Sequence, residues 1–379
     1  MNIFQTLTIF FITLILSYQY SKIVKVRRKR ALKLFLWHTI FCAIYIKFAI
    51  DQDLDALGYF YNSINYIHTS FISNDFILLI TSVFSKYLGF NFVSCSLIYN
   101  FIGVIGVITM DAIIAPIAKE TTPITKFLSE LLIWSPTLHF WTSSISKDAI
   151  VFTSINLIVY SLIEPRKRFL LLFPCFLLVS ACRPYIGIVL FSSIITALFS
   201  KIDIPRNYKI TLRLVAILLF SSIFSFGVAQ FSFRSDISIQ SVTSLLEYHR
   251  TVTEVGTTSV DMNSLSIPMR FFTYMFRPLF FDATGLLGIF ASFDNLILLS
   301  YFVYPIMICF SLQKIPKPKL NSVNLFSLIY VSITWFFLSS TTSNLGLALR
   351  HKLMFITPFV FLMINFSKVL KARKNSNQY

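Results

Sequence analysis

Long apolar runs recur along almost the whole chain, and no other sequence feature constrains its fold as strongly. Many reach about 18 to 20 residues, the length that a helix needs to cross a bilayer core of about 30 Å. Hydrophobic residues make up 56% of the chain, charged residues 13%, and the mean hydropathy is +0.73. Soluble domains carry about 25% charged residues, and a β-barrel would show short alternating segments. The sequence therefore predicts an all-α, polytopic integral membrane protein.

Basic turns between the apolar runs predict how the chain crosses the membrane. The turn at 22–33 is rich in Lys and Arg and has no acidic residue, as is typical of cytoplasmic loops. We therefore expect the N-terminus outside and the C-terminus in the cytoplasm. The first run lacks a basic leader and a cleavage site, so it is expected to be a retained anchor. About 11 transmembrane helices are expected, near residues 2–20, 34–50, 92–114, 127–140, 149–162, 169–182, 186–200, 210–231, 296–312, 325–340 and 353–366.

Two outer segments, 51–90 and 231–295, are expected to form the functional site. Within the first, residues 59–89 are amphipathic and aromatic, which favours two short surface or re-entrant helices over a full span. The second is too polar to span lipid and too apolar for a free loop, which indicates a lid or an interfacial helix pair. No linker or soluble domain is evident, so 1–379 is expected to form a single membrane domain.

Outer cations are the first group of candidate site residues. A charge within a turn of a span is costly unless it is paired or faces water, and arginine donates two parallel hydrogen bonds to a phosphate. Arg270 and Arg277 are seven residues apart, which predicts one helical face. The simpler interpretations are a local ion pair at Lys147-Asp148, a turn at 183–185 and headgroup anchors elsewhere. The candidates for substrate binding are Lys147, Arg183, Tyr185, Arg250, Arg270, Arg277, Arg350 and His351.

Acidic residues after the second span are the candidates for catalysis. Asp51, Asp53 and Asp55 either end the helix in solvent, or one of them is a general base or a ligand for a phosphate-bound metal. No cofactor is expected, and a divalent metal is left open. The five cysteines lack metal-ligand spacing, and His38, His68 and His139 are scattered and expected to be structural. The basic turns account for the net charge of +17, so no nucleic-acid partner is expected.

Four short motifs resemble those of a known group of bacterial membrane proteins. The chain is similar to Wzy-type O-antigen and exopolysaccharide polymerases of the GT-C glycosyltransferase superfamily. Arg277 and Gly288 fit that family's spacing of arginine, ten residues and glycine, and the acidic run 51–55 is similar to the aspartate-bearing first loop of many GT-C enzymes. The motifs are Trp134-Ser-Pro136-Thr-Leu-His-Phe-Trp141-Thr-Ser-Ser-Ile-Ser-Lys147-Asp148-Ala, Arg183-Pro184-Tyr185, Phe276-Arg277-Pro278-Leu-Phe-Phe and Asn344-Leu-Gly346-Leu-Ala-Leu-Arg350-His351-Lys352.

The resemblance implies glycan transfer from a polyprenyl diphosphate carrier to an acceptor at the outer face of the bacterial inner membrane. Arg183, Arg270, Arg277 and Arg350 would hold the diphosphate and stabilise the leaving group, and Asp53 or Asp55 would activate the acceptor hydroxyl. The expected partners are the polyprenyl-diphosphate-linked oligosaccharide, membrane lipid and a chain-length regulator. No nucleotide sugar is expected at an outward site.

Two other functions remain open from the sequence. A flippase or transporter of lipid-linked glycan would carry charged residues inside its spans, and only Lys47 and Asp111 fit that description. An acyltransferase acting on surface glycan would need a buried histidine with a cytoplasmic donor entrance, for which the sequence offers no clear candidate. Both rank below the transferase.

Overall fold

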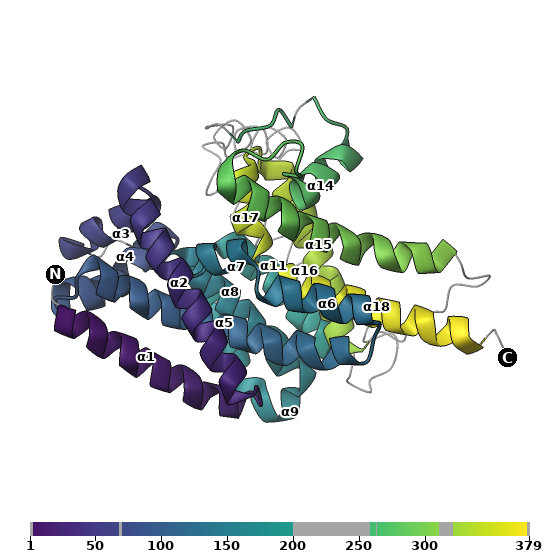
Figure 1. The fold of residues 1–379 in the computed structure, drawn as a ribbon, viewed down its shortest axis with the longest axis horizontal. Coiled ribbons are helices and arrows are strands. Elements are labelled where there is room, and N and C mark those ends of the chain that lie inside the picture. The colour runs from purple at the N-terminus through teal and green to yellow at the C-terminus, as the bar shows by residue number, and fades with distance from the viewer. Residues whose placement is uncertain (1–2, 68–69, 200–257, 263, 311–320, 377–379) are drawn as a thin grey trace. The chain divides into compact units, whose positions relative to one another are not determined.

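The computed structural model describes residues 3–67, 70–199, 258–262, 264–310 and 321–376 (Figure 1). These residues form helices and one isolated antiparallel bridge between Ser259 and Asn344, so the all-α prediction is confirmed for this part of the chain. The predicted span at 210–231 and the candidate Arg250 lie outside the described residues.

The chain packs as two compact units. The first consists of Met1–Lys119 and Lys126–Pro184, and the second of Glu120–Thr125 and Tyr185–Tyr379. Each has its own core and is described separately below. A single membrane domain over 1–379 stays a prediction.

Long apolar helices embed the protein in a membrane. Five described helices are long and apolar enough to cross a bilayer. A sixth span results if α17 and α18 are counted as one. Together they are also long and apolar enough to cross a bilayer, although the chain bends by 66° between them. The number of eleven spans stays a prediction. The five helices are α1 (Ile3–Ile23), α2 (Arg28–Gln52), α5 (Phe92–Lys119), α15 (Gly285–Phe310) and α16 (Ser322–Thr341); the bent pair is α17 (Leu345–Lys352) and α18 (Ile356–Ser376).

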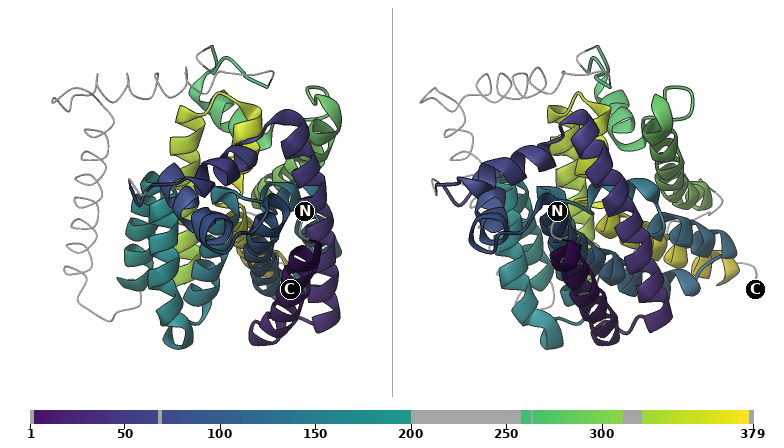
Figure 2. Two further views of the ribbon diagram at one scale, coloured as in Figure 1. Left: turned by 90° about the vertical axis from the view of Figure 1, so that its left-hand side faces the viewer. Right: turned by 60° about the vertical axis from the view of Figure 1, so that its left-hand side comes forward.

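Helix α5 is the centre of the first unit. It packs against α1, α2 and α8, and α10 packs on the other side of α8 (Figure 2). Two glycines allow this close packing, as small residues do in membrane helix pairs. A Cβ on Gly103 would lie 2.1 Å from the Thr142 carbonyl oxygen, and one on Gly106 would lie 2.5 Å from Thr153 Oγ1. The shorter helices of this part are α8 (Lys147–Ile163), α9 (Pro165–Arg168), η2 (Phe169–Leu171), α10 (Leu172–Cys182) and, opening the second unit, α11 (Pro184–Phe199).

The segment 51–90 forms short helices, as the sequence predicts. These are α3 (Asp55–Ile64), α4 (Asn74–Ser82) and the π-helix η1 (Val83–Tyr87). The segment is fixed to the first unit because the Ser73 N–H donates to the Ala181 carbonyl at 2.7 Å. The Thr81 and Tyr99 hydroxyls add a second buried contact at 2.9 Å.

The predicted span at 127–140 is wrong as a continuous helix. The structure has two short helices instead, α6 (Pro123–Ile133) and α7 (Pro136–Trp141). Ser135 lies between them with ψ at 124°, because a residue before proline is driven out of the α region. Its hydroxyl then accepts the Leu138 N–H at 3.2 Å and caps α7.

The second unit contains α14 (Ile267–Phe276), which packs against α15, α16 and α17, while α18 packs against α15 and α16. The strip 258–260 pairs with the chain after α16: the Val260 N–H donates to Ser343 O at 2.8 Å, and the Leu345 N–H to Thr258 O at 3.0 Å. The described residues of the predicted outer segment 231–295 thus contain the short amphipathic helix α14 and the start of the long helix α15.

Candidate functional site

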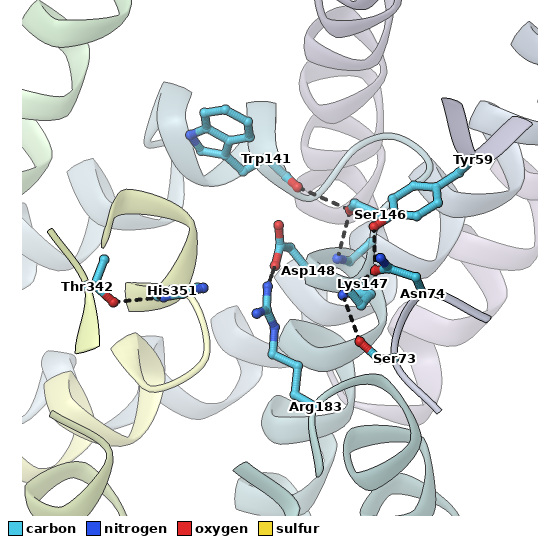
Figure 3. Close-up of polar contacts among 11 residues, drawn as sticks. Tyr59, Ser73, Asn74, Trp141, Ser146, Lys147, Asp148, Arg183, Thr342 and His351 are labelled. Carbon is cyan, nitrogen blue, oxygen red and sulfur yellow. Dashed lines mark hydrogen bonds and ion pairs between the residues drawn. The ribbon is translucent and has the colours of Figure 1, made fainter. Parts of the chain in front are cut away.

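A group of polar side chains gathers where α8 begins. We call it the α8 cluster; its members are Tyr59, Ser73, Asn74, Lys147, Asp148 and Arg183 (Figure 3). The sequence fixes the helix start at this point, because the Ser146 hydroxyl accepts the Ala149 N–H at 3.3 Å. Asp148 lies in the first turn, where a carboxylate interacts favourably with the helix dipole.

Arg183 and Asp148 form a buried ion pair. Arg183 Nη2 donates to Asp148 Oδ1 at 2.8 Å, and the side chains are only 10% and 1% exposed. Arg183 directly follows α10, so the pair joins the end of α10 to the start of α8. The simpler interpretation from the sequence was a local ion pair between Lys147 and Asp148, whereas the structure pairs Asp148 with Arg183, 35 residues away.

Lys147 faces the surface segment. Its Nζ donates to Asn74 Oδ1 at 2.7 Å and to Ser73 Oγ at 3.3 Å. The Tyr59 hydroxyl donates to the same Asn74 oxygen at 3.0 Å. The ammonium is half-buried, and it connects α8 to the short helices of 51–90. The structure therefore brings Lys147, Asp148 and Arg183 of the sequence motifs together.

The three candidate catalytic aspartates lie on exposed helix ends. Asp53 closes α2 in the left-handed conformation, with φ at 51°, and its N–H donates to Ala49 O. Asp55 opens α3, and the side chains of Asp51, Asp53 and Asp55 are all exposed. This placement fits helix termination, and a role as general base stays a prediction.

In the second unit, Arg270 and Arg277 do not share a helical face. Helix α14 ends at Phe276, and Arg277 follows it with extended backbone, φ −106° and ψ 156°. The predicted common face is therefore wrong, because the seven-residue spacing crosses the end of the helix. Arg277 Nε donates to Asp282, which also accepts the Leu279 N–H. Arg270 Nε donates to Leu265 O at 2.9 Å.

Lys352 is a buried cation with neutral acceptors. Its Nζ donates to Asn295 Oδ1 at 2.6 Å, to Met275 O at 3.1 Å and to Arg277 O at 3.4 Å, and the residue is 3% exposed. An ammonium has three donors, so these contacts use all of them. Lys352 therefore joins the ends of α14 and α17 to Asn295 within α15.

The other predicted residues of this unit occupy separate places. His351 Nδ1 lies 3.5 Å from the Thr342 hydroxyl in a buried setting (Figure 3). Arg350 is half-buried on α17, and the Tyr185 ring packs 5.4 Å from that of Phe337. Nothing in these contacts assigns a ligand to them.

Two buried polar groups in the first unit were not predicted from the sequence. Arg30 donates to both Asp111 oxygens at 2.7 and 2.8 Å, and its Nη2 is 2.8 Å from Glu130. His38 and His139 are fully buried, with their Nδ1 atoms 2.7 Å apart. The prediction that these histidines are scattered is therefore wrong. The one available signal was a charged or imidazole side chain inside an apolar run.

Among the described residues, no group of three or more His, Cys, Asp and Glu side chains is arranged to hold a metal ion. All five cysteines are free thiols, and four of them are buried. Comparisons with protein-family models, with curated proteins and with solved structures found no match to this chain.

Proposed function

We propose that the protein is a membrane glycosyltransferase of the polysaccharide polymerase type. It would transfer glycan from a polyprenyl diphosphate carrier to an acceptor on the outer face of the bacterial inner membrane. The observation that carries the proposal is the α8 cluster. There a lysine, an arginine and the positive end of a 17-residue helix lie together beside a surface segment. That combination suits an anionic headgroup.

The contacts refine the role of each residue in the proposal. Lys147 is half-buried and is the cation of the α8 cluster that faces the surface segment, so it would contact the carrier phosphates. Arg183 would remain paired with Asp148, and this neutral pair would position the start of α8 next to Lys147. Arg270, Arg277 and Arg350 of the second unit are further candidates for the diphosphate. Asp53 or Asp55 would accept the proton of the acceptor hydroxyl.

The experiment compares three variants in bacteria that depend on this chain for polymer. Lys147→Met removes the charge, and Asn74→Ala removes the contact of Lys147 with the surface segment but keeps the charge. Lys86→Met is the matched control, because Lys86 lies in the same segment and donates to the Tyr66 carbonyl at 3.0 Å. We expect loss of polymer in Lys147→Met, with normal protein level, and polymer in both others. Equal loss in Lys147→Met and Asn74→Ala would make the lysine structural and contradict the proposal.

A flippase of lipid-linked glycan is the second candidate function, because charged side chains do lie within the helices of the first unit. Asp111 is 3% exposed on α5 and binds Arg30 of α2 through both oxygens. Charges of this kind mark substrate or ion pathways in membrane proteins. The leaflet in which single lipid-linked repeat units accumulate separates the two functions. A failed polymerase leaves them on the outer leaflet, and a failed flippase leaves them on the inner one.

A further inference from the structure

His38 of α2 and His139 of α7 contact each other inside the first unit, and each also contacts a backbone carbonyl. Their Nδ1 atoms are 2.7 Å apart. His139 Nε2 lies 2.9 Å from the Ile133 carbonyl oxygen, and His38 Nε2 lies 3.3 Å from that of Thr142. Both residues are 0% exposed, so the rings are shielded from bulk solvent. Their mutual contact and these two carbonyls are the hydrogen bonds of the pair in the part of the chain that the structure describes.

The three contacts set the number of protons on the pair. A carbonyl oxygen only accepts, so each Nε2 must carry a hydrogen. The contact between the two Nδ1 atoms needs one more hydrogen, which one nitrogen donates and the other accepts. That makes three protons, whereas two neutral imidazoles carry two. We infer that His38 and His139 form a buried proton-binding site that holds one proton beyond the neutral pair, and so carries one positive charge.

The other protonation states leave one contact repulsive. With two protons, two lone pairs face each other at one of the three positions, in a site shielded from bulk solvent. With four protons, two N–H groups meet across 2.7 Å. Three protons satisfy every nitrogen of the pair, and the single charge is shared between two rings.

The C-terminal ends of α6 and α7 supply the two carbonyls. Ile133 is the last residue of α6, and Thr142 is the C-cap of α7. Carbonyls at helix C-termini have no partner inside the helix and carry partial negative charge. Ends of broken membrane helices bind cations in this way. The broken span therefore provides two negative helix ends for the protonated pair.

Aromatic rings cover His139 as well. The Phe41 ring is stacked on it with centroids 6.1 Å apart, and the Trp37 ring meets it edge-on at 6.5 Å. The face of an aromatic ring attracts a cation, so the Phe41 stack favours a protonated His139.

One ion cluster on the packed elements carries the charge opposite to that of the histidine pair. Arg30 precedes His38 by eight residues on α2, about 12 Å along the axis. Arg30 with Asp111 and Glu130 sums to one negative charge (+1 −1 −1), which opposes the one positive charge of the histidine pair. The charged groups of these elements are Arg28, Lys29, Arg30, Lys33, Lys47 and Asp51 of α2, Asp111 and Lys119 of α5, and Lys126 and Glu130 of α6.

Gly103 of α5 makes the Thr142 contact possible. A Cβ at this position would lie 2.1 Å from the Thr142 oxygen and 2.6 Å from His38 Nε2. Gly103→Ala is therefore expected to push this carbonyl and ring apart. Gly58→Ala on α3 is the matched control, because a Cβ there meets nothing within 4 Å. The inference does not depend on the proposed transferase, because none of these residues belongs to the α8 cluster.

The test is nitrogen NMR of the full-length protein in lipid nanodiscs at pH 7, with 15N-labelled imidazoles. Bare and protonated ring nitrogens have separate shifts, and His38→Gln and His139→Gln assign the signals. We expect three of the four nitrogens to be protonated in the native protein, and two in Gly103→Ala. Gly58→Ala should match the native spectrum. Two or four protonated nitrogens in the native protein would overturn the site. Since that measurement does not use Gly103→Ala, a misfolded Gly103→Ala does not prevent the test. A folded Gly103→Ala variant that still has three protonated ring nitrogens would overturn the role of the Thr142 carbonyl.

Discussion

Arg183 and Asp148 are charge partners across 35 residues of sequence, with Nη2 and Oδ1 2.8 Å apart and both side chains nearly fully buried. Burial makes the contact structural, and its place beside Lys147 puts it in the proposed site. Stability and activity must therefore be separated in any test of these residues.

Replacing one partner of this pair should cost far more stability than replacing both. Arg183→Met leaves the Asp148 carboxylate without its cation, and breaking a buried pair costs about 3 to 5 kcal/mol. The double variant Arg183→Met with Asp148→Leu should recover most of that loss, because apolar replacements of a buried pair are often neutral. Unfolding midpoints in detergent measure this. A double variant as unstable as the single one would show that the unpaired Asp148 carboxylate is not the main cause of the lost stability.

The two carboxylates that contact Arg30, those of Asp111 and Glu130, should contribute unequally to stability. Asp111 is 3% exposed and binds Arg30 through both oxygens, whereas Glu130 is 41% exposed and contacts one nitrogen. We expect Asp111→Asn to lower the free energy of unfolding by about 3 kcal/mol. Glu130→Gln should lower it by less than about 1 kcal/mol. Unfolding midpoints in detergent compare the two variants. Equal losses of stability would show that the exposure of the carboxylate does not determine how much its ion pair stabilises the protein.

The sequence predicted the elements of this fold better than their partners. Hydrophobic periodicity and length identified the helices at 3–23, 28–52, 92–119 and 322–341 and the two short helices of 51–90. It missed the break at Ser135 because the flanking runs are apolar enough for one span. Periodicity assigns a side chain to a face but not to a partner. The contacts of His38 with His139, 101 residues apart, and of Arg30 with Asp111 therefore required the folded chain.

Lys352 should matter for the folding of the second unit. Lys352→Met leaves Asn295 Oδ1 and the Met275 carbonyl without their donor in a buried site. An unsatisfied buried acceptor costs about 1 to 3 kcal/mol, so the expected loss is about 3 kcal/mol. Lys368→Met is the control, because Lys368 pairs with Glu120, whose side chain is 64% exposed. Differential scanning calorimetry in detergent measures the stability of both variants. A Lys352→Met variant as stable as the native protein would contradict the anchoring role.

Single cysteines should report the predicted topology. Asp55 and Ser259 are exposed, and Lys167 has a side chain that is 78% exposed, so a thiol at each position is reachable. A membrane-impermeant maleimide on intact spheroplasts should label Asp55→Cys and Ser259→Cys, and label Lys167→Cys after lysis. The native chain is the control for background labelling of its own five cysteines, of which four are buried. Labelling of Asp55→Cys and Lys167→Cys from the same side would contradict the predicted eleven-span topology.

The acidic run after α2 gives the sharpest test of the transferase, because its geometry separates basicity from structure. Asp53 adopts the left-handed conformation, with φ at 51° and ψ at 52°. Asparagine tolerates this conformation as well as aspartate does, whereas alanine does not. Asp53→Asn therefore keeps the helix end and removes the base, and Asp53→Ala disturbs both. Asp55→Asn makes the same exchange in the first turn of α3.

If Asp53 or Asp55 is the general base, the corresponding asparagine variant should be made at normal level and should stop chain extension, because an amide does not accept the hydroxyl proton. Single lipid-linked repeat units should then accumulate on the outer leaflet. Asp51→Asn is the control from the same exposed run. Normal polymer in Asp53→Asn, in Asp55→Asn and in the double variant would exclude both carboxylates from the chemistry. The three aspartates would then only end α2 and start α3, and the transferase would depend on its cations alone.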